Sequence, residues 1–456
     1  MTSPETKALG TGRNSLGRVV LSSMIGNGLE WYDFALYGYF STLIAQLFFP
    51  ASNPTASLLA TYGAFAAGFV MRPLGGFLFG NIGDKLGRKK ALMWSIHLMS
   101  VPTFLIGCLP TFDSIGWWAP FFLTLIRLLQ GLSMGGEFTG SIIFIVEHAG
   151  GKRRGFWGSF APFSALLGIL IGSGLSALLS GLLTPEALAS WGWRIPFLLS
   201  LSGGWLGTYM RKTLEETKSF KAKKPATQAP LMRTLWANHK KSLATVFLID
   251  FLVAIGFYMI VTFLVGYFEH FLGLSKQQAL FINTCGMLTF TCCIPLSGLL
   301  LDRVGRKPVM LVAAGLFALA AVPLFQNFLS GDFYAVLGGH MVLGGLMGFY
   351  FAAIPAVLVE SFPAHVRYSG ISIAHNLSMA LFGGSTPFLV TLLMNQTGSY
   401  LSPGIYLTFA SMAALCGLFF LKDRTHQSLA SIDEDTTDGA PAAAEFTNDN
   451  EAIGQR

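Results

Sequence analysis

Long apolar runs alternate along the chain with short polar loops. A helix of about 20 apolar residues is long enough to cross the hydrocarbon core of a bilayer. We expect twelve such helices, over residues 18–46, 56–82, 91–110, 117–147, 155–181, 190–210, 242–270, 277–301, 309–329, 334–362, 368–396 and 402–421. Pro73, Pro162, Pro295, Pro355 and Pro387 fall inside these runs and should kink or break the helices there. The pattern predicts an all-α membrane protein with twelve transmembrane helices.

The composition excludes a soluble protein. Of the 456 residues, 52% are hydrophobic and only 12% are charged, whereas an average soluble protein has about 25% charged residues. So few charges cannot cover the surface of a soluble chain of this length. The five cysteines lie in apolar stretches without metal-ligand spacing, so we interpret them as packing residues and expect no metal site.

The net charge of +7 is unevenly distributed along the chain. Lys and Arg residues lie in alternate loops and in the two tails, and the exceptions are Arg72, Arg127, Arg194 and Lys276. Because positively charged loops remain on the cytoplasmic side of a membrane, both termini are predicted to be cytoplasmic. This topology accounts for the basic loops, so we expect no nucleic-acid partner.

Two loops share the pattern G-x-x-x-D-[KR]-x-G-R-K, one beginning at Gly80 and the other at Gly298. Each loop joins the second and third predicted helices of a group of six. A pattern that recurs at the equivalent place in both groups indicates internal duplication. Asp84 and Asp302 can cap the following helix or pair with nearby arginines. We therefore predict two pseudo-symmetric six-helix bundles.

The chain should divide into five segments. They are an N-terminal arm (1–17), a first bundle (18–210), a cytoplasmic interdomain loop (211–241), a second bundle (242–421) and an acidic tail (422–456). The tail gathers Asp and Glu among Ala, Thr and Gly, a composition typical of disorder. We expect the tail to be disordered.

Ionisable residues inside transmembrane helices are costly and commonly functional. Two predicted helices carry a polar face: Asn27, Glu30, Asp33 and Tyr37 in the first, and Arg127, Gln130, Met134, Glu137 and Ser141 in the fourth. Arg127 and Glu137 lie about 15 Å apart along the helix axis, so Arg127 needs a partner such as Glu30 or Asp33. Facing polar stripes predict a water-filled cavity where a guanidinium binds a carboxylate and an acid exchanges protons. A structural ion pair is the alternative for each group.

Weaker candidates lie elsewhere in the predicted helices. Asp250 and His375 are candidates for proton coupling, with a structural polar contact and a satisfied buried histidine as the alternatives. Four other charges are interpreted as structural, Arg72 as a packing brace and the rest as anchors at helix ends: Glu147, Glu360 and Arg367. The motifs G-x-x-x-x-G-K-[ST], H-E-x-x-H and G-x-S-x-G are missing, so we expect no enzymatic activity and no catalytic residues.

Several motifs together resemble the major facilitator superfamily, and within it the metabolite:proton symporter family. They are Gly26-Asn27-x-x-Glu30-Trp31-Tyr32-Asp33, Arg72-Pro73-Leu74-Gly75-Gly76, Arg127-x-x-Gln130-Gly131-x-x-x-Gly135-Gly136-Glu137, Gly192-Trp193-Arg194-Ile195-Pro196 and Phe362-Pro363-x-x-x-Arg367-Tyr368-Ser369. The resemblance runs from about Arg18 to Asp423. It implies the major facilitator fold, in which two six-helix halves rock about a central site. It also implies that both glycine-rich loops act as cytoplasmic gate latches, through Gly80, Asp84, Arg88, Gly298, Asp302 and Arg306.

The stretch from Gly135 to Glu147 is most similar to proline/betaine transporters, with citrate and 2-oxoglutarate carriers next. We therefore predict a proton-coupled symporter of a bacterial inner membrane that imports a zwitterion such as proline or glycine betaine. Substrate binding is assigned to Asn27, Glu30, Tyr37, Arg127 and Gln130. Proton coupling is assigned to Asp33, Glu137, Asp250 and His375.

The expected partners are a small-molecule substrate, a proton and the lipid bilayer. We expect a monomer that needs no cofactor, because the proton gradient drives transport. A di- or tricarboxylate:proton symporter, for citrate or 2-oxoglutarate, is the first alternative. An alternative of another class is a transporter-like membrane sensor that signals through the acidic tail or the 211–241 loop.

Overall fold

The computed structural model describes residues 15–50, 54–151, 153–221 and 231–435. Within these ranges, ten helices are long and apolar enough to cross a membrane. Six of these lie in the second half and four in the first, and helices α1 and α9 bring the first half to six as well. The predicted all-α architecture of twelve spanning elements is therefore confirmed.

The first half contains α1 to α9. Its spanning helices are α1 (Leu16–Tyr39), α3 (Pro54–Lys85), α4 (Arg88–Cys108), α6 (Trp118–Ala149), α7 (Arg154–Leu182) and α9 (Arg194–Thr213). Shorter elements connect them: α2 (Ser41–Phe48), α5 (Phe112–Ile115), α8 (Pro185–Ala187) and the π-helical η1 (Leu188–Gly192). The predicted first span 18–46 is therefore two helices, with the boundary at Phe40.

The second half contains α12 to α20. Three of its spans are single helices: α14 (Lys276–Val304), α15 (Arg306–Phe328) and α20 (Ser402–Phe420). The other three are interrupted: α12 (Lys240–Tyr258) with η2 (Met259–Phe263) and α13 (Leu264–His270), α16 (Phe333–Phe351) with α17 (Ile354–Glu360), and α18 (Arg367–Ser378) with η3 (Met379–Gly383) and α19 (Thr386–Thr397).

The prolines divide into two groups. Pro355 and Pro387 lie in the first turns of α17 and α19, directly after the interruptions. Proline is tolerated there because the first turn of a helix lacks partners for its N–H groups in any case. Pro73, Pro162 and Pro295 lie inside continuous helices, so of the two expected effects, a kink or a break, the break does not occur at these positions.

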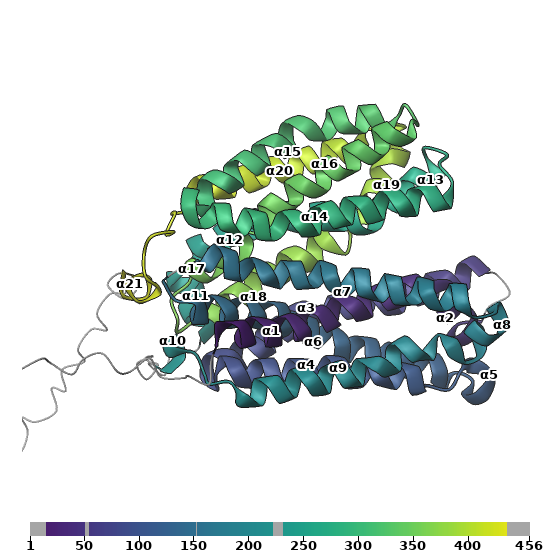
Figure 1. Cartoon of the computed structure of the whole chain (residues 1–456), viewed down its shortest axis with the longest axis horizontal. Coiled ribbons are helices and arrows are strands. Elements are labelled where there is room, and N and C mark those ends of the chain that lie inside the picture. The colour runs from purple at the N-terminus through teal and green to yellow at the C-terminus, as the bar shows by residue number, and fades with distance from the viewer. Residues whose placement is uncertain (1–14, 51–53, 152, 222–230, 436–456) are drawn as a thin grey trace, which may run out of the picture.

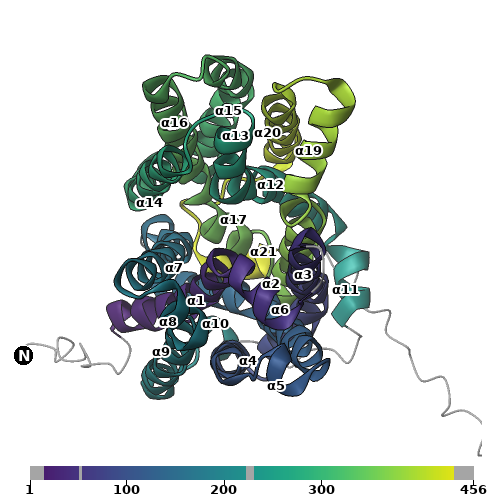
Figure 2. The same ribbon diagram turned by 90° about the vertical axis from the view of Figure 1, so that its right-hand side faces the viewer.

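The two halves lie side by side with their helices running in the same general direction (Figure 1). Contacts between the halves are concentrated in two helix pairs, α3 with α18 and α7 with α14. Figure 2 shows the same two bundles from the end. Helices α10 (Lys218–Lys221), α11 (Leu231–Asn238) and α21 (Leu429–Asp435) lie at one end of the molecule (Figure 1). We call it the basic end, because the Lys- and Arg-rich loops lie there.

Two expectations about connecting segments need correction. The 211–241 segment is not a plain loop, because α9 continues to Thr213 and both α10 and α11 form within it. Disorder is wrong for tail residues 422–435, which pack on the basic end through buried Leu429 and Ile432. Residues 1–14 of the arm and 436–456 of the tail lie outside the described residues.

Candidate functional site

A narrow cavity lies in the first half. Its walls come from α1, α3 and α6: Glu30, Asp33, Phe34, Phe65, Gly68, Phe69, Arg127, Gln130, Gly131 and Met134. Only about 10 Å³ of it can hold the centre of a water molecule, which is room for about one water. Four predicted site residues therefore share one narrow cavity: Glu30, Asp33, Arg127 and Gln130.

Arg127 is paired as the sequence predicts. Its Nη1 lies 2.6 Å from Asp33 Oδ2 and donates to Gln130 Oε1 at 2.8 Å. Gln130 in turn donates from Nε2 to the Thr103 hydroxyl at 2.7 Å. The Arg127 guanidinium lies 3.8 Å from the centre of the Tyr37 ring, a cation–π contact that fixes its plane. One edge of the guanidinium remains available, because Nε and Nη2 have no hydrogen-bond partner among the described residues.

Glu30 and Arg72 are two further buried charges near this cavity. Glu30 is fully buried, and neither of its carboxylate oxygens has a hydrogen-bond partner within the described ranges. Arg72 is also fully buried and donates from Nε to Asn376 Oδ1 of the other half at 3.4 Å. Its guanidinium lies 5.8 Å from the centre of the Phe69 ring. The sequence assigned Arg72 to packing, although its spacing from Phe65 and Phe69 places the three residues on one helix face.

Two predicted substrate-binding residues support the cavity from outside. Neither Asn27 nor Tyr37 is one of the described residues that line the cavity. Asn27 donates to the Ala161 carbonyl at 2.7 Å and to the Ser164 hydroxyl at 2.9 Å, which ties α1 to α7. The Tyr37 hydroxyl donates to the Thr61 carbonyl at 2.9 Å while its ring supports Arg127.

Glu137 does not share the cavity, which corrects the expectation of one hollow for both polar stripes. It forms a buried ion pair with Arg211 near the end of α9 and accepts a hydrogen bond from the Ser95 hydroxyl. Arg211 was assigned to the loop, but it is only 1% exposed. The separation has a simple cause, since ten helical residues place Glu137 about 15 Å from Arg127 along α6.

Asp250 and His375, predicted separately, are brought together in the second half. Asp250 Oδ2 lies 3.1 Å from His375 Nδ1, and both side chains are buried between α12 and α18. The Phe138 ring, from the first half, stacks on the imidazole with 4.9 Å between ring centres. A buried acid–base pair therefore lies at the contact between the halves.

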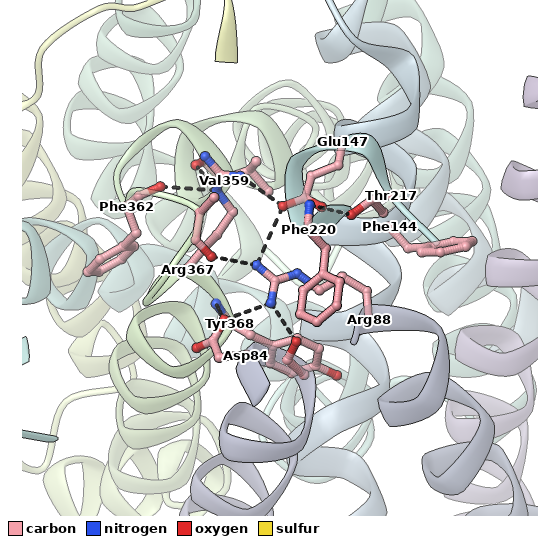
Figure 3. A network of polar contacts seen from close by, with 12 residues as sticks. Asp84, Arg88, Phe144, Glu147, Thr217, Phe220, Val359, Phe362, Arg367 and Tyr368 are labelled. Carbon is pink, nitrogen blue, oxygen red and sulfur yellow. Dashed lines mark hydrogen bonds and ion pairs between the residues drawn. The ribbon is translucent and has the colours of Figure 1, made fainter. Parts of the chain in front are cut away.

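A charge network at the basic end contains the first glycine-rich loop. We call Asp84, Arg88, Glu147 and Arg367 the first charge network (Figure 3). Arg88 Nη1 lies 2.7 Å from Asp84 Oδ1, and its Nη2 lies 3.7 Å from Glu147 Oε1. Arg367 of the second half binds the same Glu147 oxygen at 2.8 Å. Arg88 also donates to the Ala364 carbonyl at 2.7 Å.

Asp84 also joins the two halves through the backbone. Its carboxylate accepts from the N–H groups of Tyr368 at 3.2 Å and Ser369 at 2.8 Å, in the first turn of α18. Helix N-termini favour negative charge at this position. A side chain of one half thus caps a helix of the other half.

The second glycine-rich loop repeats this arrangement. We call Asp302, Arg306, Glu360 and Arg154 the second charge network. Asp302 accepts from the N–H groups of Gly155 at 2.8 Å and Phe156 at 2.9 Å, in the first turn of α7. Arg306 lies 3.4 Å from Asp302, and Glu360 lies 3.3 Å from Arg306 and 3.1 Å from Arg154.

The glycines of both loops permit close helix contact. A Cβ atom on Gly80 would lie 2.9 Å from Ser369 Cα, and one on Gly298 would lie 3.0 Å from Phe156 Cα. All six predicted gating residues therefore lie at contacts between the halves or pair with a residue that does. The sequence did not indicate that the two charge networks also include Arg154, Glu147, Glu360 and Arg367. Each of these residues lies near the end of a helix next to the repeated loops.

Known proteins show where this chain belongs. The family model described as "Sugar (and other) transporter" matches residues 19–230, and that of the Major Facilitator Superfamily matches residues 246–448. The proline/betaine transporter of Escherichia coli K12 is 32% identical, covering 96% of this chain and 88% of that protein. The chain belongs to the major facilitator superfamily, in the family of the proline/betaine transporters.

Other family members agree. The glycine betaine/proline/ectoine/pipecolic acid transporter OusA of Dickeya dadantii is 32% identical, over 96% of this chain and 88% of that protein. A putative proline/betaine transporter of Staphylococcus aureus strain COL is 36% identical, over 89% of this chain and 88% of that protein. Among solved structures, the proton:xylose symporter XylE has a TM-score of 0.80 at 17% identity, with 92% of this chain and 98% of that chain covered. This last likeness shows the fold alone.

Proposed function

We propose that the protein is a proton-coupled symporter that imports a small zwitterion, such as proline or glycine betaine, by alternating access. Its relatives are proline/betaine transporters over nearly the whole chain. The observation that carries the proposal is the cavity, in which an acid and an arginine pair beside a second, unpaired acid.

The charges around the cavity suit a ligand without net charge. Glu30 and Asp33 contribute two negative charges when ionised, and Arg72 and Arg127 contribute two positive charges. A zwitterion leaves this balance unchanged, whereas a di- or tricarboxylate would bring in two or three uncompensated negative charges. In a low-dielectric site such an excess is costly. The balance favours a zwitterion over citrate or 2-oxoglutarate.

Arg127 and Glu30 can hold the two ends of a zwitterion. The unpartnered Nε and Nη2 edge of Arg127 matches the fork geometry of a carboxylate. The unpartnered carboxylate of Glu30 can accept the cationic end. Gln130 positions Arg127, while Asn27 and Tyr37 act from outside the cavity.

Asp33 is the acid that we propose to carry the proton. Protonation would remove the charge that holds Arg127 Nη1 at 2.6 Å and would leave Arg127 free to bind a substrate carboxylate. Entry of one positive charge at 100 mV supplies about 2.3 kcal/mol, enough for accumulation on the order of tens-fold. Glu137 and the Asp250–His375 pair are proposed as secondary proton sites.

The charge networks are proposed as the latch of a gate. Positively charged loops favour the cytoplasmic side, which would orient the basic end and both termini toward the cytoplasm of a bacterial inner membrane. The structure then represents a state closed toward the cytoplasm. One chain supplies the cavity and both networks, which supports a monomer as the functional unit.

Uptake into proteoliposomes tests the proposal. Radiolabelled proline and glycine betaine should accumulate when a proton gradient is imposed, and citrate and 2-oxoglutarate should not. Asp33→Asn should abolish gradient-driven accumulation while retaining exchange, because the amide stays neutral. Glu215→Gln is a matched control, since its side chain is 57% exposed at the surface. Equal accumulation by Asp33→Asn and wild type, or uptake without a gradient, would refute the coupling.

A further inference from the structure

Arg72 is a buried charge at the contact between the halves. Its side chain is fully buried, and Nη1 and Nη2 have no hydrogen-bond partner among the described residues. Its Nε donates to Asn376 Oδ1 of α18 at 3.4 Å. Because a guanidinium carries five N–H donors, most donors of Arg72 are unused in this state. They can take up another acceptor when the contact between the halves changes.

Asn376 reaches Arg72 at a glycine of α3. A Cβ atom on Gly76 would lie 2.9 Å from Asn376 Nδ2, so a larger residue would displace the amide. Arg72 and Gly76 are one helical turn apart and lie on the same face of α3. The amide also donates to the Gly135 carbonyl of α6 at 2.8 Å. Asn376 belongs to the second half but is therefore held by α3 and α6 of the first half.

Two other polar groups lie around the Arg72 guanidinium. Among the charged side chains around Glu30, Arg72 exerts the strongest electrostatic effect, yet neither Glu30 oxygen accepts a hydrogen bond from a described residue. The Tyr258 hydroxyl, from the second half, lies close to Arg72 but outside hydrogen-bond geometry. Arg72 can thus pair with Glu30 in its own half, or with Asn376 and Tyr258 in the other half.

Opening of the basic end would change which partners Arg72 can reach. Contacts between α3 and α18 run from the glycine-rich loop at the basic end to Arg72 and Asn376. When the halves separate there, Asn376 and Tyr258 move away with the second half, while Arg72 and Glu30 stay together in the first. A buried charge without a partner is costly. The ionised carboxylate in the same half is then the partner that compensates Arg72.

We propose that Arg72 is a positioning residue that makes substrate release depend on opening: it binds Asn376 while the basic end is closed and moves to Glu30 when that end opens. In the closed state Glu30 is free to accept the cationic end of a zwitterion. In the open state Arg72 replaces that cation on the same carboxylate, and the substrate leaves. The inference rests on the proposed function, in which Glu30 holds the cationic end, and adds the step that expels the substrate.

Proline uptake by single variants in proteoliposomes tests this exchange of partners. Arg72→Gln cannot replace the substrate on Glu30, so kcat should fall about 10- to 100-fold without a rise in KM. Arg72→Lys keeps the positive charge and should restore part of the turnover. Asn376→Ala leaves Arg72 free to bind Glu30 in the closed state, so KM for proline should rise by a similar factor.

A double variant separates the exchange from a structural role. Arg72→Gln combined with Asn376→Ala should bind proline within about 2-fold of the wild type, because no guanidinium then competes for Glu30. Isothermal titration on the purified full-length protein measures this affinity. Lost packing at both positions would give additive losses instead. Asn327→Ala removes an exposed amide near the end of α15 and should match the wild type.

Two results would overturn the exchange. One is a double variant that binds proline as weakly as Asn376→Ala does, and the other is undiminished turnover of Arg72→Gln. Failure of the proposed function is distinguishable from both, because the wild type would then bind neither proline nor glycine betaine.

Discussion

The two charge networks at the basic end have nearly the same sequence but different surroundings. In each, an aspartate of the repeated loop caps a helix of the opposite half, α18 for Asp84 and α7 for Asp302. Asp84, Arg88 and Glu147 have fully buried side chains, whereas the Asp302 side chain is 13% exposed and that of Glu360 is 5% exposed. The arginine–aspartate distance is 2.7 Å in the first network and 3.4 Å in the second.

The C-terminal segment contacts the two networks in different ways. Arg154 donates from Nη2 to the carbonyl groups of Arg424, Thr425 and Gln427, and the Thr425 hydroxyl accepts from the Arg306 N–H at 3.1 Å. The first network is contacted by an acidic side chain of this segment, since Arg367 Nη2 lies 2.7 Å from Asp433 Oδ1. The duplicated motif thus makes the same helix cap in both networks, while the segments packed around the motif differ.

The largest expected difference between the networks is the response to removal of the aspartate. Asp84→Ala leaves Arg88 buried without its nearest carboxylate, which should destabilise the closed state by about 3–5 kcal/mol. Asp302→Ala should cost about 1–3 kcal/mol because water can reach this site. Spin labels at exposed positions 90 and 241, in a variant without the five cysteines, would report the widening of the basic end as a longer distance.

Equal widening in Asp84→Ala and Asp302→Ala would contradict the effect of burial. Asp84→Asn is a useful companion variant, because the amide keeps one of the two side-chain oxygens that accept from the α18 backbone. It should fall between Asp84→Ala and the wild type.

The ion pair that joins the two halves should also be stronger in the first network than in the second. We expect this difference to be smaller than the difference between the two aspartate variants. A double-mutant cycle on Glu147 and Arg367, with Gln at each position, should give a coupling energy of about 2–3 kcal/mol, against about 1 kcal/mol for Glu360 and Arg154. The first pair is 2.8 Å apart with both side chains fully buried, and the second is 3.1 Å apart and slightly exposed. Thermal unfolding of the four variants of each cycle in detergent gives the two energies. A larger coupling in the second pair would refute the ranking.

Truncation of the tail should affect the networks selectively. A chain ending at Lys422 loses the contacts with Arg154, Arg306 and Lys307, and the basic end should open about 5-fold more often. A chain ending at Ser428 keeps these contacts but loses Asp433, and should open about 2-fold more often. The same spin-label distances measure both. Transport should survive either truncation, whereas a sensor that signals through the tail would lose its output.

The smallest effect is expected at the surface pair of Lys221 and Glu215. Their charged atoms lie 3.1 Å apart, but both side chains are 57% exposed. Exposed pairs contribute about 0–1 kcal/mol, so Lys221→Gln should leave both the unfolding temperature and the basic-end distance near the wild-type values. A shift as large as that of Asp302→Ala would show that burial is not the deciding variable.

The polar stripes show what helical periodicity can predict about the site and what it cannot. It placed Glu30 and Asp33 on one face and Arg127 and Gln130 on another, and the structure brings the four to one cavity. It also placed Glu137 on the second face, but periodicity says nothing of position along the axis relative to neighbouring helices. Arg211 on α9 lies opposite Glu137 and takes it as a partner.

The tail shows a similar limit for composition. Its acidic residues favoured disorder, yet Leu429 and Ile432 are buried and Asp433 binds Arg367. The short apolar spacing of α21 carries little signal on its own. It becomes stable only where the bundle offers a surface to cover, and that surface is formed by segments distant in the chain.

By itself, the sequence determined the membrane-spanning character, the duplication and the faces on which charges lie, because these depend on local hydrophobicity and helical period. The tertiary structure alone decided which charges meet: Arg211 with Glu137, Asp250 with His375, and Arg367 with Glu147. It also brought Tyr258 to the rings of α1 and α3. The physical reason is that pairing inside a bilayer depends on the depth and rotation of whole helices, which are set by contacts between helices.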